Sequence, residues 1–213
     1  MNRKSFTQTI LSWYDQGHRD LPWRRTQDPY RIWISEIMLQ QTRAETVVSY
    51  YERFLARYPT VQDLASAPEE ELLKAWEGLG YYSRARSLQK AAKEIVARYG
   101  GQLPADLEKL RALPGIGDYT AGAIASIAFG IPAAAVDGNV ERVLCRWDAI
   151  TDEVGTPAVR RQIAARRAEG CIAVEMELAG VQAVCAHHGF ALYDFLMTGD
   201  VLDAPVYTPD GLR

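Results

Sequence analysis

Apolar residues recur at helical spacing through the first 150 positions of the chain. Within each segment they fall three or four positions apart, the repeat that places them on one face of a helix. This part of the sequence lacks the alternation of apolar and polar residues that is typical of a half-buried strand, so the pattern predicts an all-α fold. The predicted helices span Phe6–Tyr14, Tyr30–Leu39, Ala44–Tyr58, Arg84–Tyr99, Leu107–Leu113 and Tyr119–Phe129.

Residues typical of helix ends support these boundaries. Ser66 and Glu69 have the spacing of a capping box and predict a helix that runs on through Trp76. Gly100 follows the helix that begins at Arg84, as a C-terminal glycine commonly does. The pattern changes after residue 150, where we expect the helical domain to end.

A glycine hairpin, L-P-G-I-G-D-Y-T-A-G-A from Leu113 to Ala123, joins two of the predicted helices. Gly115 and Gly117 permit positive φ and remove the Cβ atoms that would keep a phosphate from the backbone. The following helix offers free N–H groups and its positive dipole end to such an anion. A bare G-x-G is equally consistent with a corner that only packs. The small residues after it favour the helix–hairpin–helix pattern of DNA-repair proteins, whose backbone contact ignores base sequence.

A single aspartate, Asp137, follows the apolar run Ile131–Val136 and opens a further helix. Spacing alone favours a helix N-cap for this residue. A carboxylate placed beside a phosphate-binding hairpin is also a candidate for catalysis on a nucleotide in DNA.

The charge balance limits how such a chain can bind DNA. Residues 1–150 hold 19 lysines and arginines against 18 acidic residues, so binding would depend on local contacts and not on a broad positive field. The longest apolar stretches are too short to span a membrane. Three cysteines form no disulfide framework, which favours a reducing cytoplasm, and we expect a nucleoid-associated monomer.

Several motifs in one order make the chain resemble the helix–hairpin–helix DNA glycosylase superfamily, and within it the adenine DNA glycosylase family. The resemblance covers about residues 20–150. It implies an all-α fold with a six-helix subdomain at about residues 29–132 and a truncated second helical subdomain. The motifs are L-P-W-R (Leu21–Arg24), D-P-Y-R-I-W-I-S-E-I-M-L-Q-Q-T (Asp28–Thr42), W-E-G-L-G-Y-Y-S-R-A-R (Trp76–Arg86), the hairpin, and V-D-G-N-V-E-R-V (Val136–Val143).

The resemblance implies four catalytic residues. Glu36 matches the glutamate that protonates the departing base, and partial burial between Ile34 and Ile37 would raise its pKa as an acid requires. Asp137 matches the aspartate that stabilises the sugar cation, and Asn139 and Tyr119 match residues that orient the pair. Lyase relatives carry a lysine nucleophile at the position of Tyr119, so the resemblance implies a monofunctional glycosylase. A lone glutamate at position 36 would otherwise be a solvated helix residue.

The resemblance also implies contacts to DNA and to the extruded base, whose exit from the stack costs a few kcal/mol. Gln41 and Tyr81 match residues that fill the gap, although Tyr81 could instead pack at a helix end. Trp23 could equally be a core aromatic. The implied partner is duplex DNA with adenine opposite guanine or 8-oxoguanine. The DNA-binding candidates are Leu39, Gln40, Gln41, Tyr81, Gly115 and Gly117, and the base-pocket candidates are Arg19, Trp23 and Arg24.

The chain departs from the family after residue 150. The family's second subdomain ends in four cysteines that hold an iron–sulfur cluster, whereas Cys171 and Cys185 lie fourteen residues apart without a C-x-x-C pair. We therefore expect no cofactor and no metal here. Residues 151–213 form an atypical tail, which resembles a C-terminal fragment of the nucleoside phosphorylase family through Ala173–Val184 and Leu192–Asp203.

Three functions follow from this reading. The first is excision of adenine mispaired with guanine or 8-oxoguanine. The second is binding of DNA without catalysis, because the truncated subdomain no longer aligns Asp137 with Glu36. The third is a protein related to nucleoside phosphorylases, which depends on the tail alone.

Overall fold

The computed structural model describes residues 3–147 and 156–157, although not every side chain within α1 and α9. The chain divides into two compact units. One is Asp20–Val136, and the other combines Met1–Arg19 with the chain from Asp137 onward. The predicted boundary near residue 150 and the phosphorylase-like segments lie outside the described residues.

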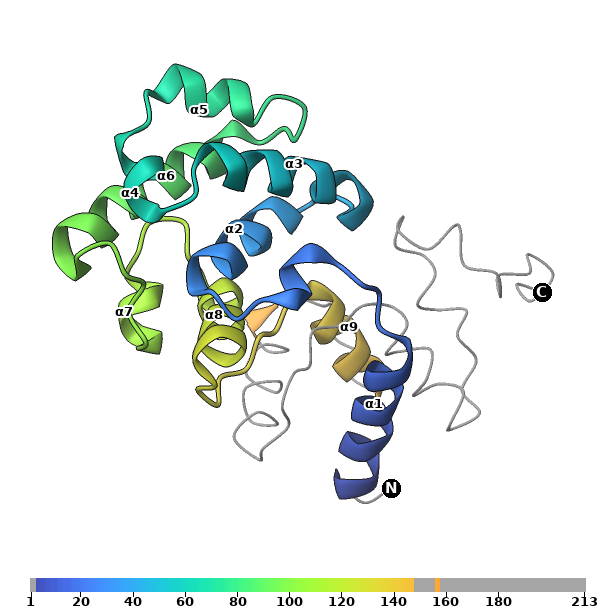
Figure 1. The fold of residues 1–213 in the computed structure, drawn as a ribbon. Coiled ribbons are helices and arrows are strands. Elements are labelled where there is room, and N and C mark those ends of the chain that lie inside the picture. The colour runs from blue at the N-terminus through green and yellow to red at the C-terminus, as the bar shows by residue number, and fades with distance from the viewer. Residues whose placement is uncertain (1–2, 148–155, 158–213) are drawn as a thin grey trace. The chain divides into compact units, whose positions relative to one another are not determined.

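Helix α2 (Pro29–Leu39) lies at the centre of the unit Asp20–Val136 (Figure 1). It begins where Pro29 fixes φ and the side chain of Asp28 accepts hydrogen bonds from the first free N–H groups. It packs against α3 (Ala44–Arg57), α8 (Asp118–Phe129) and the short 3₁₀ helix η1 (Pro22–Arg25). Neighbours on several sides explain why nearly all of α2 is buried, including its polar residues.

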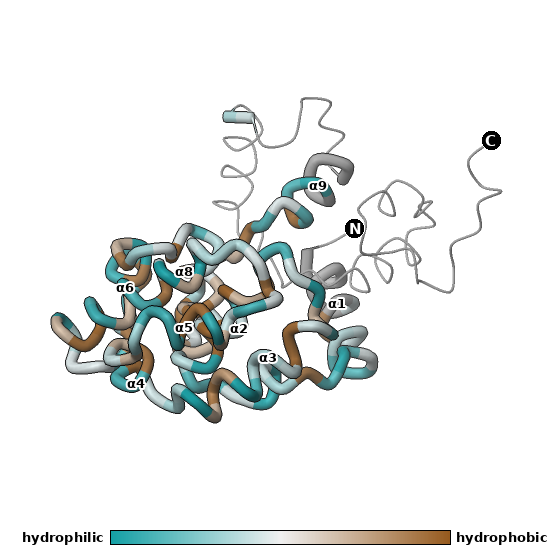
Figure 2. Tube along the Cα trace, turned by 90° about the horizontal axis from the view of Figure 1, so that it is seen from above, coloured by the Kyte–Doolittle hydropathy of each residue, from teal (hydrophilic) through white to brown (hydrophobic). Residues whose placement is uncertain are grey.

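The other helices of this unit cover that centre. Helix α6 (Tyr82–Tyr99) packs on α4 (Val61–Ser66) and α5 (Glu69–Ala75), and α7 (Leu107–Arg111) packs on α8. Along α3 and α6 the chain alternates between hydrophilic and hydrophobic residues, as amphipathic surface helices do (Figure 2).

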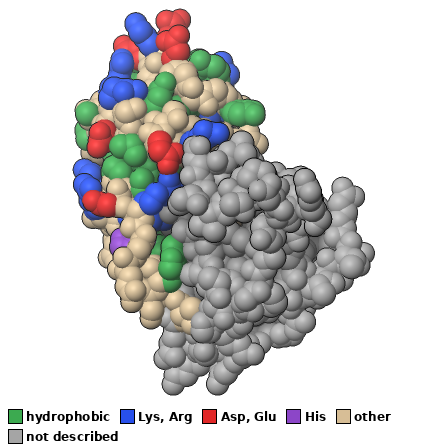
Figure 3. Space-filling model, turned by 90° about the vertical axis from the view of Figure 1, so that its right-hand side faces the viewer, with side chains coloured by type: hydrophobic (Ala, Val, Ile, Leu, Met, Phe, Trp, Pro, Cys, Tyr) green, Lys and Arg blue, Asp and Glu red, His purple; other side chains and the backbone are tan. Residues whose placement is uncertain are grey.

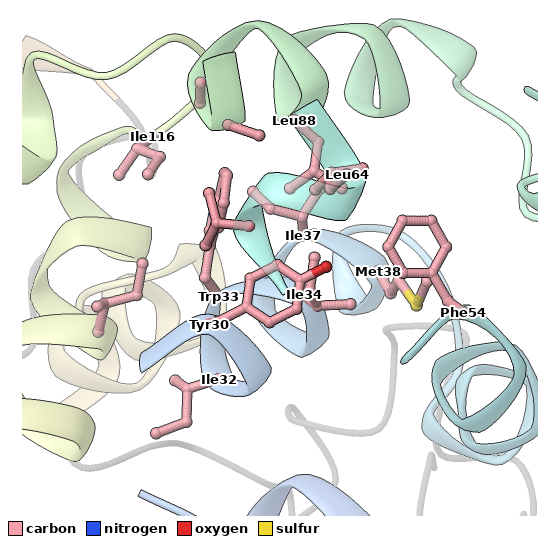
Figure 4. Close-up of a cluster of buried hydrophobic side chains, with 14 of the residues drawn as sticks. Tyr30, Ile32, Trp33, Ile34, Ile37, Met38, Phe54, Leu64, Leu88 and Ile116 are labelled. Carbon is pink, nitrogen blue, oxygen red and sulfur yellow. The ribbon is translucent and has the colours of Figure 1, made fainter. Parts of the chain in front are cut away.

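The hydrophobic core joins side chains from helices that are distant in sequence. Figure 4 shows Trp33 and Ile37 of α2 near Leu88 of α6 and Leu64 of α4, all of them buried. Each large apolar side chain buried in this way contributes about 1.5–3 kcal/mol relative to exposure. Packing in this unit therefore fixes the ends of α2, α6 and α8 relative to one another.

The predicted all-α class is confirmed, because the described residues form helices and no strand. The capping box predicted at Ser66 is wrong. Ser66 is the last residue of α4, and its hydroxyl donates back to the carbonyl of Gln62 at 2.9 Å. The capping box observed lies at the other end of α4, six residues earlier, where Thr60 and Asp63 exchange side-chain and backbone hydrogen bonds.

The second unit contains α1 (Arg3–Gly17) and α9 (Gly138–Trp147). Asp137 is the first residue after Val136 and directly precedes α9, so it stands at the start of a helix as the sequence predicts. Among the described residues, no helix has the length and apolar character that crossing a bilayer requires.

Candidate functional site

The glycine hairpin between α7 and α8 is a tight turn built from local sequence. The amide of Ile116 donates to the carbonyl of Leu113 at 3.1 Å, and Pro114 and Gly115 occupy the two central positions. Gly115 has φ of +75°, which the third position of a type II turn requires. Leu113 and Ile116 are both buried and anchor the turn in the core.

Gly117 serves the hairpin in a different way from Gly115. Its φ is −86° and its ψ −178°, an extended conformation open to any residue, so the positive φ that glycine permits is not used at this position. No atom lies within 4 Å of the place where a Cβ would stand. As the N-cap of α8, Gly117 carries no side chain that could cap the first N–H groups, so the anion-binding end of the helix stays open.

Replacing Gly115 by alanine is expected to destabilise the protein by about 1–2 kcal/mol, because a non-glycine residue is strained at this φ. The added Cβ would also lie 2.7 Å from the Cβ of Ser87 on α6. Gly117→Ala is the matched control without a positive φ and should cost less, because only a weak N-cap is lost. Urea denaturation of both variants measures the difference, and equal losses would contradict this account of the turn.

An acidic residue stands at the first position of α8, beside the open N–H groups. The carboxylate of Asp118 forms an ion pair of 2.9 Å with the guanidinium of Arg111, which comes from the last turn of α7. The ion pair closes the base of the hairpin. The negative charge of Asp118 interacts favourably with the positive dipole end of α8, but it repels an approaching phosphate.

Removing this charge is expected to strengthen DNA binding. Asp118→Asn should raise the affinity for an undamaged duplex by about threefold at low salt, because the repulsion between the carboxylate and a phosphate is lost. The gain should shrink as added salt screens exposed charges. Affinities are measured by fluorescence anisotropy. The control is Glu94→Gln, which makes the same change in net charge in the C-terminal half of α6 and not at the start of α8. An unchanged affinity for Asp118→Asn would show that no phosphate approaches this helix end.

Two exposed residues, Gln41 and Tyr81, have an unusual backbone conformation. Gln41 has φ of +59° and Tyr81 has φ of +47°, and they are the two residues other than glycine with positive φ in the described part of the chain. The side chain of Tyr81 is 62 % exposed, and Gln41 is exposed as well. Strain of this kind persists where the surrounding structure enforces it and is common in functional loops. Both residues are ones for which the sequence predicts insertion into DNA.

The loops of Gln41 and Tyr81 border a hollow that the hairpin completes. The empty space of this hollow, including the solvent at its open side, is about 390 Å³. One wall comes from α2, one from the start of α6, and the third from the hairpin. The lining residues are Trp33, Ile37, Gln40, Ser83, Arg84, Ser87, Leu88, Pro114 and Gly115. The structure thus brings Gln40, one of the DNA-binding candidates, beside Gly115.

Arg84 is the most connected polar side chain of this region. Its guanidinium reaches carbonyl oxygens at the end of α2 and in the turn before α6. Partial burial lowers the pKa of Arg84, but the ordinary pKa of an arginine lies so far above neutrality that the guanidinium stays charged at neutral pH.

Two of the predicted catalytic residues lie in this unit. Glu36 is 4 % exposed and comes from the middle of α2, one turn before Gln40. Tyr119 is half-buried in the first turn of α8. The side chain of Gln40 lies 3.4 Å from the hydroxyl of Thr120, which follows Tyr119, so the end of α2 contacts the start of α8.

The remaining candidates of this unit lie in different surroundings. Leu39 is half-buried at the end of α2. Trp23 is only 5 % exposed and packs edge-on against Tyr51, with ring centroids 5.5 Å apart. This is the core role that the sequence left open for Trp23. Arg24, the next residue of η1, is half-buried.

Arg19, Asp137 and Asn139 belong to the other unit. Asp137 caps α9: one carboxylate oxygen accepts from the amides of Asn139 and Val140 at 3.0 and 2.8 Å. The other oxygen accepts from the side-chain amide of Asn139 at 3.0 Å. Asn139 in turn accepts from the guanidinium of Arg142. These bonds fix the direction of the carboxylate, whichever role it has.

The charged residues of the first unit give no single-sign field. Residues 20–136 contain 14 lysines and arginines and 14 acidic residues. In the view of Figure 3, basic and acidic side chains lie interspersed over the described surface. Among the described residues, no group of three or more histidine, cysteine or acidic side chains could hold a metal ion. The cysteine side chains, on which the cofactor expectation depends, lie outside those described.

Known proteins identify the fold. A family model described as HhH-GPD superfamily base excision DNA repair protein matches residues 34–168. The chain belongs to this superfamily. The match extends beyond residue 150, where the sequence pattern changes.

Curated relatives within the superfamily bear the name adenine DNA glycosylase. The human protein is 51 % identical over 168 residues, which cover 75 % of this chain and 31 % of the human protein. The protein of Buchnera aphidicola (subsp. Baizongia pistaciae) is 46 % identical over 146 residues, which cover 68 % of this chain and 42 % of that protein. The expected likeness to adenine DNA glycosylases is confirmed, and the chain spans less than half the length of either relative.

Solved structures support the same assignment. A thermostable thymine-DNA glycosylase is 39 % identical, with a TM-score of 0.64, covering 67 % of this chain and 66 % of that one. Endonuclease III, solved as a non-covalent complex with DNA, is 30 % identical, with a TM-score of 0.58, covering 70 % and 72 %. These similarities confirm the predicted helix–hairpin–helix glycosylase fold.

The sequence pattern indicates no role for Arg84, for the ion pair of Arg111 and Asp118, or for a strained backbone at Gln41 and Tyr81. One signal for Arg84 was available. A cation in the first turn of a helix is disfavoured by the helix dipole, so an arginine at that place indicates a role outside its own helix.

Proposed function

We propose that the chain is a monofunctional DNA glycosylase that hydrolyses the N-glycosidic bond of adenine opposite guanine or 8-oxoguanine. The observation that carries this proposal is the 51 % identity to human adenine DNA glycosylase over 168 residues. Endonuclease III, a relative by structure, has been solved with DNA, which supports duplex DNA as the partner. In this proposal the chain acts as a monomer at the nucleoid in the cytoplasm.

The proposed chemistry uses an acid and an anion. Adenine leaves readily only after its ring nitrogen is protonated, and the sugar becomes cationic as the bond breaks. Glu36 supplies the proton to the base. The carboxylate of Asp137 stabilises the sugar cation, and Asn139 and Tyr119 orient these groups. A water molecule, guided by Asp137, then bonds to the anomeric carbon of the sugar and gives up a proton, which completes the hydrolysis without a cofactor.

The proposed binding mode places the hairpin on a DNA phosphate. Gly115 gives the turn its shape, and Gly117 keeps the N–H groups of α8 accessible to the anion. Gln41 and Tyr81 enter the space left when adenine leaves the stack, with Leu39 and Gln40 beside them. Arg19 and Arg24 contribute to the surroundings of the extruded base, whereas Trp23 packs against Tyr51 in the core.

Tyr119 supports a reaction without lyase chemistry. A tyrosine hydroxyl cannot form the Schiff base that a lysine forms at this position in lyase relatives. We therefore expect an abasic site in an otherwise intact strand as the product.

Single-turnover assays on a duplex with one adenine:8-oxoguanine pair test the proposal. The expected result is release of free adenine, strand cleavage only after alkali, and no protein–DNA adduct upon borohydride treatment. A borohydride-trapped adduct would contradict the monofunctional mechanism. Thymine opposite 8-oxoguanine in the same duplex provides the control base.

A second candidate is a binding protein without excision activity. The observation that favours it is the N-cap of α9, in which both oxygens of Asp137 already accept hydrogen bonds. In that case the duplex would bind through the hairpin while adenine release stays at the uncatalysed rate. Anisotropy and excision, measured on the same sample, distinguish the two candidates.

A further inference from the structure

The two strained loops share one partner. Gln41 follows α2, and Tyr81 precedes α6, 40 positions later in the chain, yet both have left-handed backbone conformations. A conformation that L-residues avoid persists where contacts over-determine it. The guanidinium of Arg84 supplies such contacts to both loops.

The guanidinium lies between the two loops and donates to each of them. Its Nη1 reaches the end of α2 and the residue before Gln41. Its Nη2 reaches the glycine turn before Tyr81 and a hydroxyl just after Gln41. The acceptors are the carbonyls of Ile37 at 3.0 Å, Met38 at 3.1 Å, Gln40, Leu79 at 2.9 Å and Gly80 at 3.4 Å, and the hydroxyl of Thr42 at 3.4 Å.

Physical chemistry favours an arginine at this place. The last carbonyls of α2 lack partners within the helix and form its negative dipole end, which attracts a cation. A guanidinium presents its donors in a rigid planar fork, whereas a lysine ammonium offers three donors around one point. The fork also lies over two rings, with Arg84 Cζ 5.6 Å from the Trp76 centroid and 5.5 Å from the Tyr81 centroid.

Trp76 supports the turn before Tyr81 from the side of the core. Its ring is fully buried, and its indole N–H donates to the carbonyl of Gly80 at 3.2 Å. The turn before Tyr81 is therefore held by the core on one side and by Arg84 on the other. The loop of Gln41 has a comparable support in the contact between Gln40 and Thr120.

We propose that Arg84 is a positioning residue that couples the loops of Gln41 and Tyr81, so that the two side chains enter the DNA stack as one preorganised unit. The insertion of these side chains rests on the proposed function. The coupling itself is a property of the free protein. Loss of the guanidinium frees both loops, although they are far apart in sequence.

Amide hydrogen exchange of the free protein tests the coupling without any DNA chemistry. In Arg84→Met we expect exchange to accelerate by about tenfold or more in residues 40–42 and in residues 79–81 together. Arg86→Met is the matched control, since Arg86 lies on the same helix and makes an exposed ion pair with Glu69. It should leave both loops unchanged. Acceleration in one loop only, or equal acceleration in the control, would overturn the coupling.

Arg84→Lys is a second, milder variant that keeps the test valid if Arg84→Met fails to fold. It keeps the charge and the aliphatic stem but loses the fork. We expect the slow-exchanging core amides of α6 to stay protected in this variant, while at least one of the two loops exchanges faster. Full protection of both loops in Arg84→Lys would show that charge alone suffices and would overturn the role of the fork.

A double-mutant cycle tests the consequence for excision. In the wild-type background, Gln41→Ala and Tyr81→Ala should be non-additive in single-turnover rate, because each disrupts the same unit. In the Arg84→Met background their effects should become additive. Additivity in both backgrounds would overturn the joint insertion. If every variant, including the wild type, releases no adenine, the proposed function fails while the exchange experiment still decides the coupling.

Discussion

Replacing Glu36 by glutamine is expected to slow adenine release by about a hundredfold or more, because general acid catalysis contributes roughly 10²–10⁴. Glutamine has nearly the same shape but no acidic proton. The glutamate is 4 % exposed in the middle of α2, so its proton would be delivered in a site from which water is largely excluded. Single-turnover kinetics on the adenine:8-oxoguanine duplex measure the loss.

Two controls make the role of Glu36 specific. Glu45→Gln, an exposed change in the first turn of α3, should leave the rate within about twofold of wild type. A substrate with 7-deazaadenine lacks the nitrogen that is protonated, so wild type and Glu36→Gln should act on it equally slowly. A clear difference between the two enzymes on that substrate would mean that Glu36 acts elsewhere than on the base.

Asp137→Asn is expected to slow release by a comparable factor, about a hundredfold or more, because a neutral amide no longer stabilises the cationic sugar. Asparagine caps helices about as well as aspartate, so α9 should retain its N-terminus. We expect the free energy of unfolding to change by less than about 0.5 kcal/mol. A larger loss would show that asparagine does not preserve the N-cap.

The alanine variant separates catalysis from capping at Asp137. Asp137→Ala removes the oxygens that accept from the amides of Asn139 and Val140, and it should cost about 1 kcal/mol of stability in addition to the rate. If Asp137 serves only as a cap, Asp137→Asn keeps the wild-type rate and only the alanine variant is affected. Kinetics and urea denaturation of both variants therefore distinguish the two roles.

Local chemistry made much of the fold predictable. The L-P-G-I turn depends on a proline and a glycine in adjacent positions, and the structure has the corresponding type II geometry with Gly115 at φ of +75°. Helix α2 matches its predicted span to within one residue, because its cap and its apolar repeat lie within the segment itself. The capping box at Ser66 was predicted wrongly, because Ser66 has the right spacing to Glu69 but ends α4, and α5 begins only after Pro68.

Contacts between distant segments could not be predicted in the same way. The sequence was compatible with Trp23 either in the base pocket or in the core. Only its packing against Tyr51 of α3 placed the ring in the core. Positive φ at Gln41 and Tyr81 contradicts the preference of both residue types, so no propensity indicates it. The side chain of Arg84 supports both conformations, and it lies 43 positions beyond Gln41 and three beyond Tyr81.

The sequence by itself determined the helical class, the hairpin and its turn, the family, and the identity of the candidate acid and anion. Each of these depends on residues that are neighbours along the chain or that form a motif in a recognisable order. Only the tertiary structure decided that Glu36 is buried, that Gly117 leaves the end of α8 open, and that Arg84 joins the two strained loops. These features depend on where separate helices meet, and packing of the whole unit around α2 sets those positions.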